Sequence, residues 1–167
     1  MANTLKGLYI GGQWVRTATQ FDDLNPSDGS VWATAPNASL TETAMAIGAA
    51  QEAFPKWAAL PFQERSHFMI KVASVIERRK NDFVEALRYE GGGWIGKGMF
   101  EAGYVPEVFH AAAASNYASI GEVMPSEHGK FSLAVRRPMG VITCISPWNF
   151  PVVLTARGIA FALAAGN

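Results

Sequence analysis

The sequence predicts an α/β fold that contains the first half of a β-α-β unit. Residues 141–145 (VITCI) form a short, continuous apolar run, which is typical of a strand buried on both faces. Pro147 ends this strand, residues 152–165 have the pattern of a buried helix, and Gly166 is placed to terminate it. Strand and helix patterns also alternate earlier in the chain, which stops before the second strand of this unit.

The N-terminal residues carry short strand and turn signals. Residues 9–15 (YIGGQWV) place a Gly-Gly pair between two short strand-like runs, which predicts a hairpin. Residues 25–29 (NPSDG) predict a turn, because proline restricts the backbone and glycine adopts conformations that other residues disfavour. A strand is expected over residues 31–35 and should stop at Pro36.

Helical signals dominate the region from residue 39 to residue 120. Ser39 and Glu42 have the spacing of a capping box, in which the two side chains satisfy free N–H groups at the start of a helix. We predict helices over residues 40–54 (ending at Pro55), from Pro61 to the polar stretch 77–82, over 83–89 and over 99–120 with a bend at Pro106. Two strands should follow at 122–124 and 131–137, joined around residues 126–130.

Composition excludes several classes of protein. The 167 residues carry 14 basic and 14 acidic side chains, so the net charge of +0 gives no electrostatic basis for a nucleic-acid partner. An apolar content of 49% with 17% charged residues excludes global disorder. The single cysteine, Cys144, excludes an intrachain disulfide framework and fits a reducing, cytoplasmic compartment. Because it lies in the expected strand, we expect it to be a small buried thiol.

The mean hydropathy of +0.08 is high for a small soluble domain, which indicates either a membrane segment or a piece of a larger fold. The N-terminus has no long apolar core, so no secretory signal is expected. Residues 147–167 approach the ~20 residues that span a bilayer, but Asn149, Arg157 and two prolines disfavour spanning. We therefore expect no membrane partner.

Two other features have the outline of ligand sites without the required context. Gly91–Gly96 satisfy a dinucleotide glycine motif and Gly91–Lys97 nearly satisfy a P-loop, but a helix precedes them where both motifs need a strand. His67, His110 and His128 have no partners at metal-ligand spacing, so no metal site is expected.

Residues 140–151 are different in kind, because the expected strand delivers the turn Pro147–Pro151 at its carboxyl end. Ligands bind at this edge of open α/β sheets. Two prolines stiffen the turn around Asn149, whose side-chain amide can donate to a fixed point, and Trp148 and Phe150 supply flat apolar walls. The residues alone leave a second interpretation open, in which this aromatic loop only fills the core.

This turn resembles the Pro-Trp-Asn-Phe-Pro motif of the NAD(P)-dependent aldehyde dehydrogenase superfamily, and the resemblance covers nearly the whole chain. Residues 9–15 are similar to the family's opening hairpin, and residues 25–29 to its Asn-Pro-x-x-Gly turn. Further matches in the same order are residues 53–57 (AFPKW), 61–65 (PFQER), 137–141 (RPMGV) and 162–167 (ALAAGN).

The resemblance implies an aldehyde dehydrogenase-like three-layer fold, of which this chain is an incomplete N-terminal part. Residues 1–120 would supply the hairpins and helices of the cofactor-binding domain, and residues 121–139 the strands of an oligomerisation arm. Residues 140–167 would supply the first strand, the Pro-Trp-Asn-Phe-Pro loop and a helix of the dinucleotide-binding sheet, truncated after that helix.

The resemblance also implies residue roles. Asn149 aligns with the asparagine whose amide helps to form the oxyanion hole for a tetrahedral thiohemiacetal. The cofactor, NAD or NADP, would lie against Ile145, Ser146, Pro147, Trp148 and Asn149. The substrate tunnel would include Phe150, Leu154 and Arg157.

Two departures from the broader family are similar to its benzaldehyde, vanillin and salicylaldehyde dehydrogenase branch. Arg157 stands where most of the family has tryptophan, and a cation there could meet a ring face or a phenolic oxygen. Residues 90–100 resemble the glycine-rich, Gly-Met-Phe-containing stretch of that branch, which implies a structural role for the glycines.

The implied activity is oxidation of an aromatic aldehyde to the carboxylic acid with NAD(P)⁺. The family's nucleophilic cysteine, its glutamate base, and its cofactor-contacting lysine and glycine turn cannot be placed in these residues. We therefore expect this chain alone to be inactive. A homodimer or homotetramer is implied for the complete enzyme. The alternative is a non-catalytic fragment that acts in association only, through residues 122–137.

Overall fold

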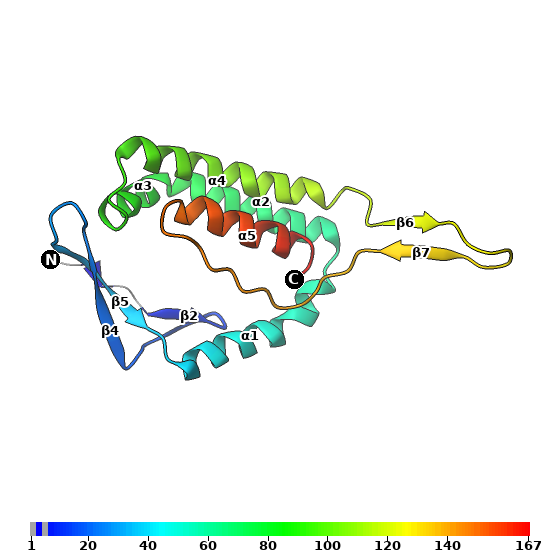
Figure 1. Ribbon diagram of the computed structural model, residues 1–167, viewed down its shortest axis with the longest axis horizontal. Coiled ribbons are helices and arrows are strands. Elements are labelled where there is room, and N and C mark those ends of the chain that lie inside the picture. Colours follow the sequence, from blue (N-terminus) through cyan, green and yellow to red (C-terminus); the bar gives the residue numbers. More distant parts are fainter. Residues whose placement is uncertain (1–2, 5–6) are drawn as a thin grey trace.

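The computed structural model describes residues 3–4 and 7–167. Helices α2 (Phe62–Arg78), α3 (Lys80–Tyr89) and α5 (Pro151–Ala164) pack around α4 (Ile95–Ser115), whereas α1 (Leu40–Ala58) runs apart from them (Figure 1). The N-terminal strands lie at one end of the molecule. A hairpin of β6 (Gly121–Met124) and β7 (Ser132–Val135) projects from the other end (Figure 1). The predicted mixture of helices and strands is therefore confirmed.

The N-terminal strands form two small sheets. In the first, β5 (Val31–Asn37) lies between β1 (Asn3–Thr4) and β4 (Thr19–Leu24). In the second, β2 (Leu8–Ile10) and β3 (Gln13–Val15) form the hairpin predicted around the Gly-Gly pair. The prediction that the strand stops at Pro36 is wrong. β5 continues through it, paired with β4 at Gln20, and among the described residues the pairing with β1 involves residues 33–34 and not the proline, which has no N–H group to donate.

The capping box at the start of α1 is confirmed. The Ser39 hydroxyl accepts a hydrogen bond from the Thr41 N–H, and the Glu42 carboxylate accepts one from the Ser39 N–H at 2.8 Å. The predicted end at Pro55 is wrong, because α1 continues to Ala58. The last turn is anchored from outside the helix, since the Trp57 indole donates to the carbonyl oxygen of Leu163 at 2.9 Å.

The core lies between α2, α4 and α5. Small side chains let the helices approach closely, and the longer ones fill the remaining space. The predicted helix 99–120 is shifted, because α4 runs from Ile95 to Ser115 with Pro106 inside it. Across the described residues, no helix combines the length and apolar content that crossing a bilayer requires. The buried core residues are Met69, Ala73, Ile76, Val105, Val108, Phe109, Ala112, Ala113, Val153, Ala156, Ala160 and Ala164.

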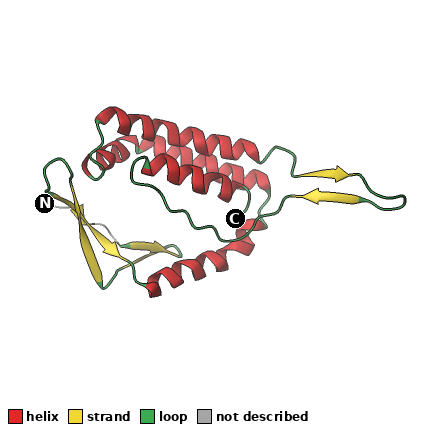
Figure 2. Cartoon of the chain, in the orientation of Figure 1, coloured by secondary structure: helices red, strands yellow, loops and turns green. Residues whose placement is uncertain are grey.

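The predicted buried strand at residues 141–145 is wrong. This segment runs as a loop between α5 and α1 and belongs to no sheet (Figure 2). Cys144 is exposed, contrary to the expected buried thiol, and Ile145 is 90% exposed. A strand needs a neighbour to pair its N–H and C=O groups, and no strand of the described residues lies beside this segment.

Glu90, which follows α3, makes stability depend on pH. Partial burial raises its pKa above the ordinary 4.5, the charge of Asp23 raises it further, and Lys97 opposes both. The folded chain therefore holds this proton more tightly than the unfolded chain. The stability that protonated Glu90 confers is fully present below about pH 4.5 and is lost as the pH rises through the raised pKa.

We expect the Glu90→Gln variant to keep its stability as the pH rises, because glutamine does not lose a proton. Its urea midpoint should match that of the wild type near about pH 4 and exceed it near about pH 8. Glu85→Gln, at an exposed position on the preceding helix α3, is the matched control and should not change the pH dependence in this way. Equal midpoints for Glu90→Gln and the wild type at both pH values would contradict the prediction.

Candidate functional site

The loop predicted to carry function, residues 146–150, connects residues 141–145 to α5. One hydrogen bond joins the two ends of this loop, because the Ser146 hydroxyl donates to the carbonyl oxygen of Pro151 at 2.7 Å. Pro151 is the first residue of α5, where a missing N–H group costs nothing. The Asn149 side chain is exposed, and its amide has no hydrogen-bond partner among the described residues. The amide is therefore free to donate to a ligand.

The predicted cofactor-facing residues are open to solvent. Ile145 is 90% exposed and Trp148 is 89% exposed, so an isoleucine side chain and an indole face offer apolar surface beside Asn149. Flat rings of a dinucleotide fit such a surface. The loop does not fill the core, which was the second interpretation of its aromatic residues.

The predicted substrate-facing residues lie on one face of α5, at spacings of four and three residues. Phe150 and Arg157 both contact aromatic residues of α4. The Phe150 ring meets the Phe100 ring edge to face, with 6.3 Å between centroids, and Phe100 stacks on Tyr104 at 5.7 Å. The Arg157 guanidinium lies 5.6 Å from the Tyr104 ring centroid and donates to its hydroxyl at 3.3 Å. We call Phe100, Tyr104, Phe150 and Arg157 the α4–α5 aromatic cluster.

The third predicted residue, Leu154, is half-buried on α5 between Phe150 and Arg157. Tyr104 was not identified from the sequence, although Phe100 and Tyr104 have the four-residue spacing that places two side chains on one face of a helix.

A buried ion pair lies beneath the start of α5. Lys97 Nζ lies 2.7 Å from Glu101 Oε1, and the Glu101 side chain is fully buried. The second carboxylate oxygen of Glu101 accepts hydrogen bonds from the N–H groups of Val152 and Val153, at 3.1 and 3.3 Å. Lys97 Nζ also lies 5.1 Å from the Phe150 ring centroid. Sequence analysis missed this pair, although its Lys-to-Glu spacing of four residues is typical of a helical ion pair.

The start of α5 does not fit a pyrophosphate. Free N–H groups at a helix N-terminus are the usual binding site for a phosphate. Here Glu101 already accepts from both available groups and carries a negative charge of its own. The start of α5 therefore lacks the free N–H groups that a phosphate would need.

The glycine-rich stretch 91–98 covers the connection between α3 and α4 and the first turn of α4, so a helix and not a strand precedes it. Gly92 has a φ of +60°, and a Cβ there would lie 2.6 Å from the Pro26 ring. Gly98 lies against the Val84 backbone, with 3.3 Å available to a Cβ. These glycines allow close packing, and the context that a phosphate-binding motif requires is missing.

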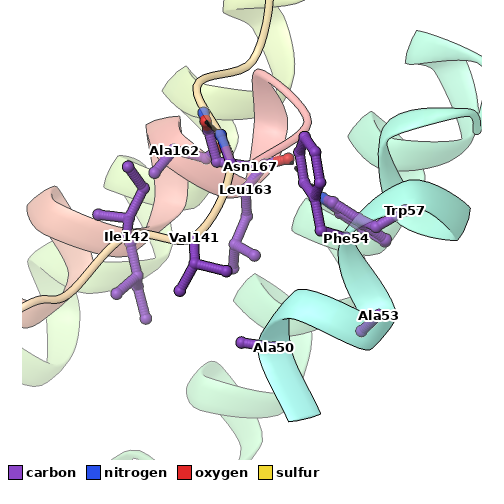
Figure 3. A pocket seen from close by; sticks show the side chains of 11 residues that line it. Ala50, Ala53, Phe54, Trp57, Val141, Ile142, Ala162, Leu163 and Asn167 are labelled. Carbon is purple, nitrogen blue, oxygen red and sulfur yellow. Dashed lines mark hydrogen bonds between the residues drawn. The ribbon is translucent and has the colours of Figure 1, made fainter. Parts of the chain in front are cut away.

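Two other kinds of candidate site in the described residues would be a metal site and a cavity. No cluster of three or more His, Cys, Asp or Glu side chains in the described part of the chain could hold a metal ion. A cavity of about 400 Å³ lies between α1, residues 140–142 and the C-terminal half of α5 (Figure 3). Asn149 is not among the residues that line it. Its lining is almost entirely apolar. At its edge, Asn167 accepts hydrogen bonds from the Met139 and Gly140 N–H groups.

The sequence profile of the aldehyde dehydrogenase family matches residues 14–167. This chain belongs to the aldehyde dehydrogenase family. The resemblance carried by the Pro-Trp-Asn-Phe-Pro turn and the ordered matches around it is thereby confirmed.

Relatives of this aldehyde dehydrogenase chain include enzymes named for aromatic aldehydes. It is 38% identical to vanillin dehydrogenase of Pseudomonas fluorescens over 165 residues, which are 96% of this chain and 34% of that protein. It is 37% identical to an NAD(+) benzaldehyde dehydrogenase of Pseudomonas putida, over 96% of this chain and 34% of that protein.

Comparison with solved structures also finds a dehydrogenase named for an aromatic aldehyde. The structure of this chain matches the crystal structure of a salicylaldehyde dehydrogenase from Pseudomonas putida G7 in complex with salicylaldehyde, with a TM-score of 0.94 at 32% identity. That match covers 100% of this chain and 35% of the other. The aldehyde dehydrogenase chain described here therefore spans about a third of the length of the relatives it matches.

Proposed function

We propose that this chain acts as the N-terminal third of an NAD(P)-dependent dehydrogenase that oxidises aromatic aldehydes to carboxylic acids. The observation that carries the proposal is the exposed Asn149 amide, which has no hydrogen-bond partner among the described residues. In this role it donates a hydrogen bond to the oxyanion that forms when a cysteine thiolate attacks the aldehyde carbon. The oxygen is then stabilised as its charge develops.

The α4–α5 aromatic cluster supports an aromatic substrate. Phe150 and Phe100 present ring surfaces, and the Arg157 guanidinium beside Tyr104 can interact with a ring face or a phenolic oxygen. Leu154 completes the apolar side of this surface. The relatives named for vanillin, salicylaldehyde and benzaldehyde support the same substrate class.

NAD or NADP is the proposed cofactor, and its nicotinamide accepts the electrons that the aldehyde loses. Ile145 and Trp148 offer apolar surface for its rings, and Ser146, Pro147 and Asn149 of the same turn are proposed to complete the cofactor-facing surface. The nucleophilic cysteine and the glutamate base are proposed to lie in the other two thirds of the enzyme. Cys144 is a poor candidate, because, although the residue is exposed, its Sγ packs against Gly158 of α5 and lies 4.0 Å from the Thr155 carbonyl oxygen.

A chimera tests the proposal. In it, this chain replaces the corresponding third of the Pseudomonas putida salicylaldehyde dehydrogenase, and NADH formation is followed with salicylaldehyde and with an aliphatic aldehyde. We expect turnover by the chimera, with preference for the aromatic substrate, and none by the 167-residue chain alone. Turnover by the chain alone, or a folded chimera without activity, would contradict the proposal.

Association through the β6–β7 hairpin is the second candidate function, and an exposed apolar surface favours it. Val123 and Leu133 are cross-strand neighbours that are 68% and 55% exposed, and the hairpin projects from the rest of the chain (Figure 1). We propose that this surface pairs with a second copy, to give a homodimer or homotetramer in the cytoplasm. If the chain acts in association only, the chimera assembles without turnover.

Introducing a charge at this surface should weaken assembly. We expect Leu133→Glu to shift the chimera toward monomer in sedimentation velocity, because a carboxylate is costly to bury in an apolar contact. Ala134→Glu, on the opposite face of the same strand, is the matched control and should have a smaller effect. Equal sedimentation of both variants and the wild type would exclude this surface.

A further inference from the structure

We infer that Glu101 is a positioning residue whose carboxylate caps α5 and thereby fixes the place of Asn149. The inference rests on the proposed function for the role of Asn149. The cap itself rests only on hydrogen bonds within this chain.

The loop cannot cap α5 by itself. The residue at the N-cap position is Phe150, whose side chain has no oxygen to accept from the first turn. Pro151 has no N–H group, and the Leu154 N–H donates to the Phe150 carbonyl oxygen at 3.1 Å. The N–H groups of Val152 and Val153 are left, and half-buried or buried donors need partners.

Glu101, on helix α4, supplies the acceptor for both of these N–H groups. One carboxylate oxygen accepts from Val152 and Val153, and the other lies 2.7 Å from Lys97 Nζ. A negative charge is also favourable beside the positive end of the helix dipole. The carboxylate is fully buried in α4, so it can hold the start of α5 at a fixed place on the helical core.

Asn149 lies three residues before Val152 in a segment with little freedom. Prolines at 147 and 151 restrict the backbone on both sides, and the Phe150 ring contacts both Phe100 and Lys97. A shift in the start of α5 must therefore move the Asn149 amide as well. A misplacement of about 1 Å in a catalytic group can cost about 10²-fold in rate.

Amide hydrogen exchange in the full 167-residue chain tests the cap. We expect Glu101→Leu to speed exchange at Val152 and Val153 by about 10-fold or more relative to the core amides of α4, because the oxygen that accepts from both N–H groups is lost. Glu101→Gln keeps an acceptor oxygen and should rescue most of the protection. Ser66→Ala removes another buried hydrogen bond, to Ala113, and should leave Val152 and Val153 unchanged relative to α4. Unchanged exchange in Glu101→Leu would overturn the cap.

Kinetics of the chimera test the positioning role. We expect Glu101→Leu to lower kcat by about 10- to 100-fold while KM changes by less than about 3-fold, and Glu101→Gln to recover most of kcat. In an Asn149→Ala background, Glu101→Leu should lower kcat by less than about 2-fold, because the group that it positions is gone. Ser66→Ala should leave kcat unchanged.

The outcomes separate this inference from the proposed function. An undiminished kcat in Glu101→Leu, or an equal loss in the Asn149→Ala background, overturns the positioning role. A folded wild-type chimera without turnover overturns the proposed function, and selective exchange at Val152 and Val153 then still supports the cap. If Glu101→Leu does not fold, Glu101→Gln decides, since a modest increase in exchange confined to these two amides is expected there.

Discussion

Replacing Asn149 with alanine is expected to lower kcat of the chimera by about 10²- to 10³-fold, because one oxyanion-hole donor is lost. The exposed amide has no hydrogen-bond partner among the described residues, so its removal leaves no other group unpaired and should not disturb the fold. KM should change little, since the developing charge is greatest in the transition state. The measurement is the steady-state rate of NADH formation.

The matched control is Asn81→Ala, an exposed asparagine on α3. It should retain wild-type kcat and KM. If Asn149→Ala loses less than about 10-fold in kcat, the amide does not act at the oxyanion, because the typical cost of such a donor is larger. Loss of secondary structure in Asn149→Ala would instead show that this side chain supports the fold.

The features that the sequence predicts correctly depend on neighbouring residues. The capping box of Ser39 and Glu42 spans four positions, and the hairpin of β2 and β3 is specified by the glycines between its strands. The helix predicted over residues 152–165 is observed as α5 at Pro151–Ala164, and its end before Gly166, which has a φ of +96°, follows from the same kind of local signal. The loop around Asn149 could be located for this reason.

The features that the sequence misses depend on distant residues. β4 carries polar side chains at both Asp22 and Asp23, so it lacks the alternation that marks a strand, and its pairing with β5 becomes visible only in the fold. Residues 141–145 have strand-like side chains, but no described strand supplies their backbone partners. The cap on α5 comes from Glu101, about fifty positions earlier in the chain, and local spacing cannot indicate it.

Replacing Lys97 with methionine is expected to lower the free energy of unfolding by about 3–5 kcal/mol, because a fully buried carboxylate loses the one cation that pairs with it among the described residues. The Lys97 side chain is itself only 18% exposed, so water cannot fully replace it. A second substitution should reverse most of the loss. In Lys97→Met with Glu101→Gln, the neutral amide can still accept from the start of α5, and no unpaired charge remains buried.

A matched control separates charge burial from the loss of a lysine beside an aromatic ring. Lys71 lies 5.6 Å from the Phe68 ring centroid, as Lys97 lies 5.1 Å from that of Phe150, but Lys71 is exposed. Lys71→Met should therefore change the unfolding free energy by no more than about 0.5 kcal/mol in urea denaturation followed by circular dichroism. A cost below about 1 kcal/mol for Lys97→Met would mean that Glu101 is stabilised by the α5 N–H groups alone. The cap would then hold the start of α5 without the cation, and the rigidity of the Asn149 loop would depend on Glu101 and the two prolines rather than on the ion pair.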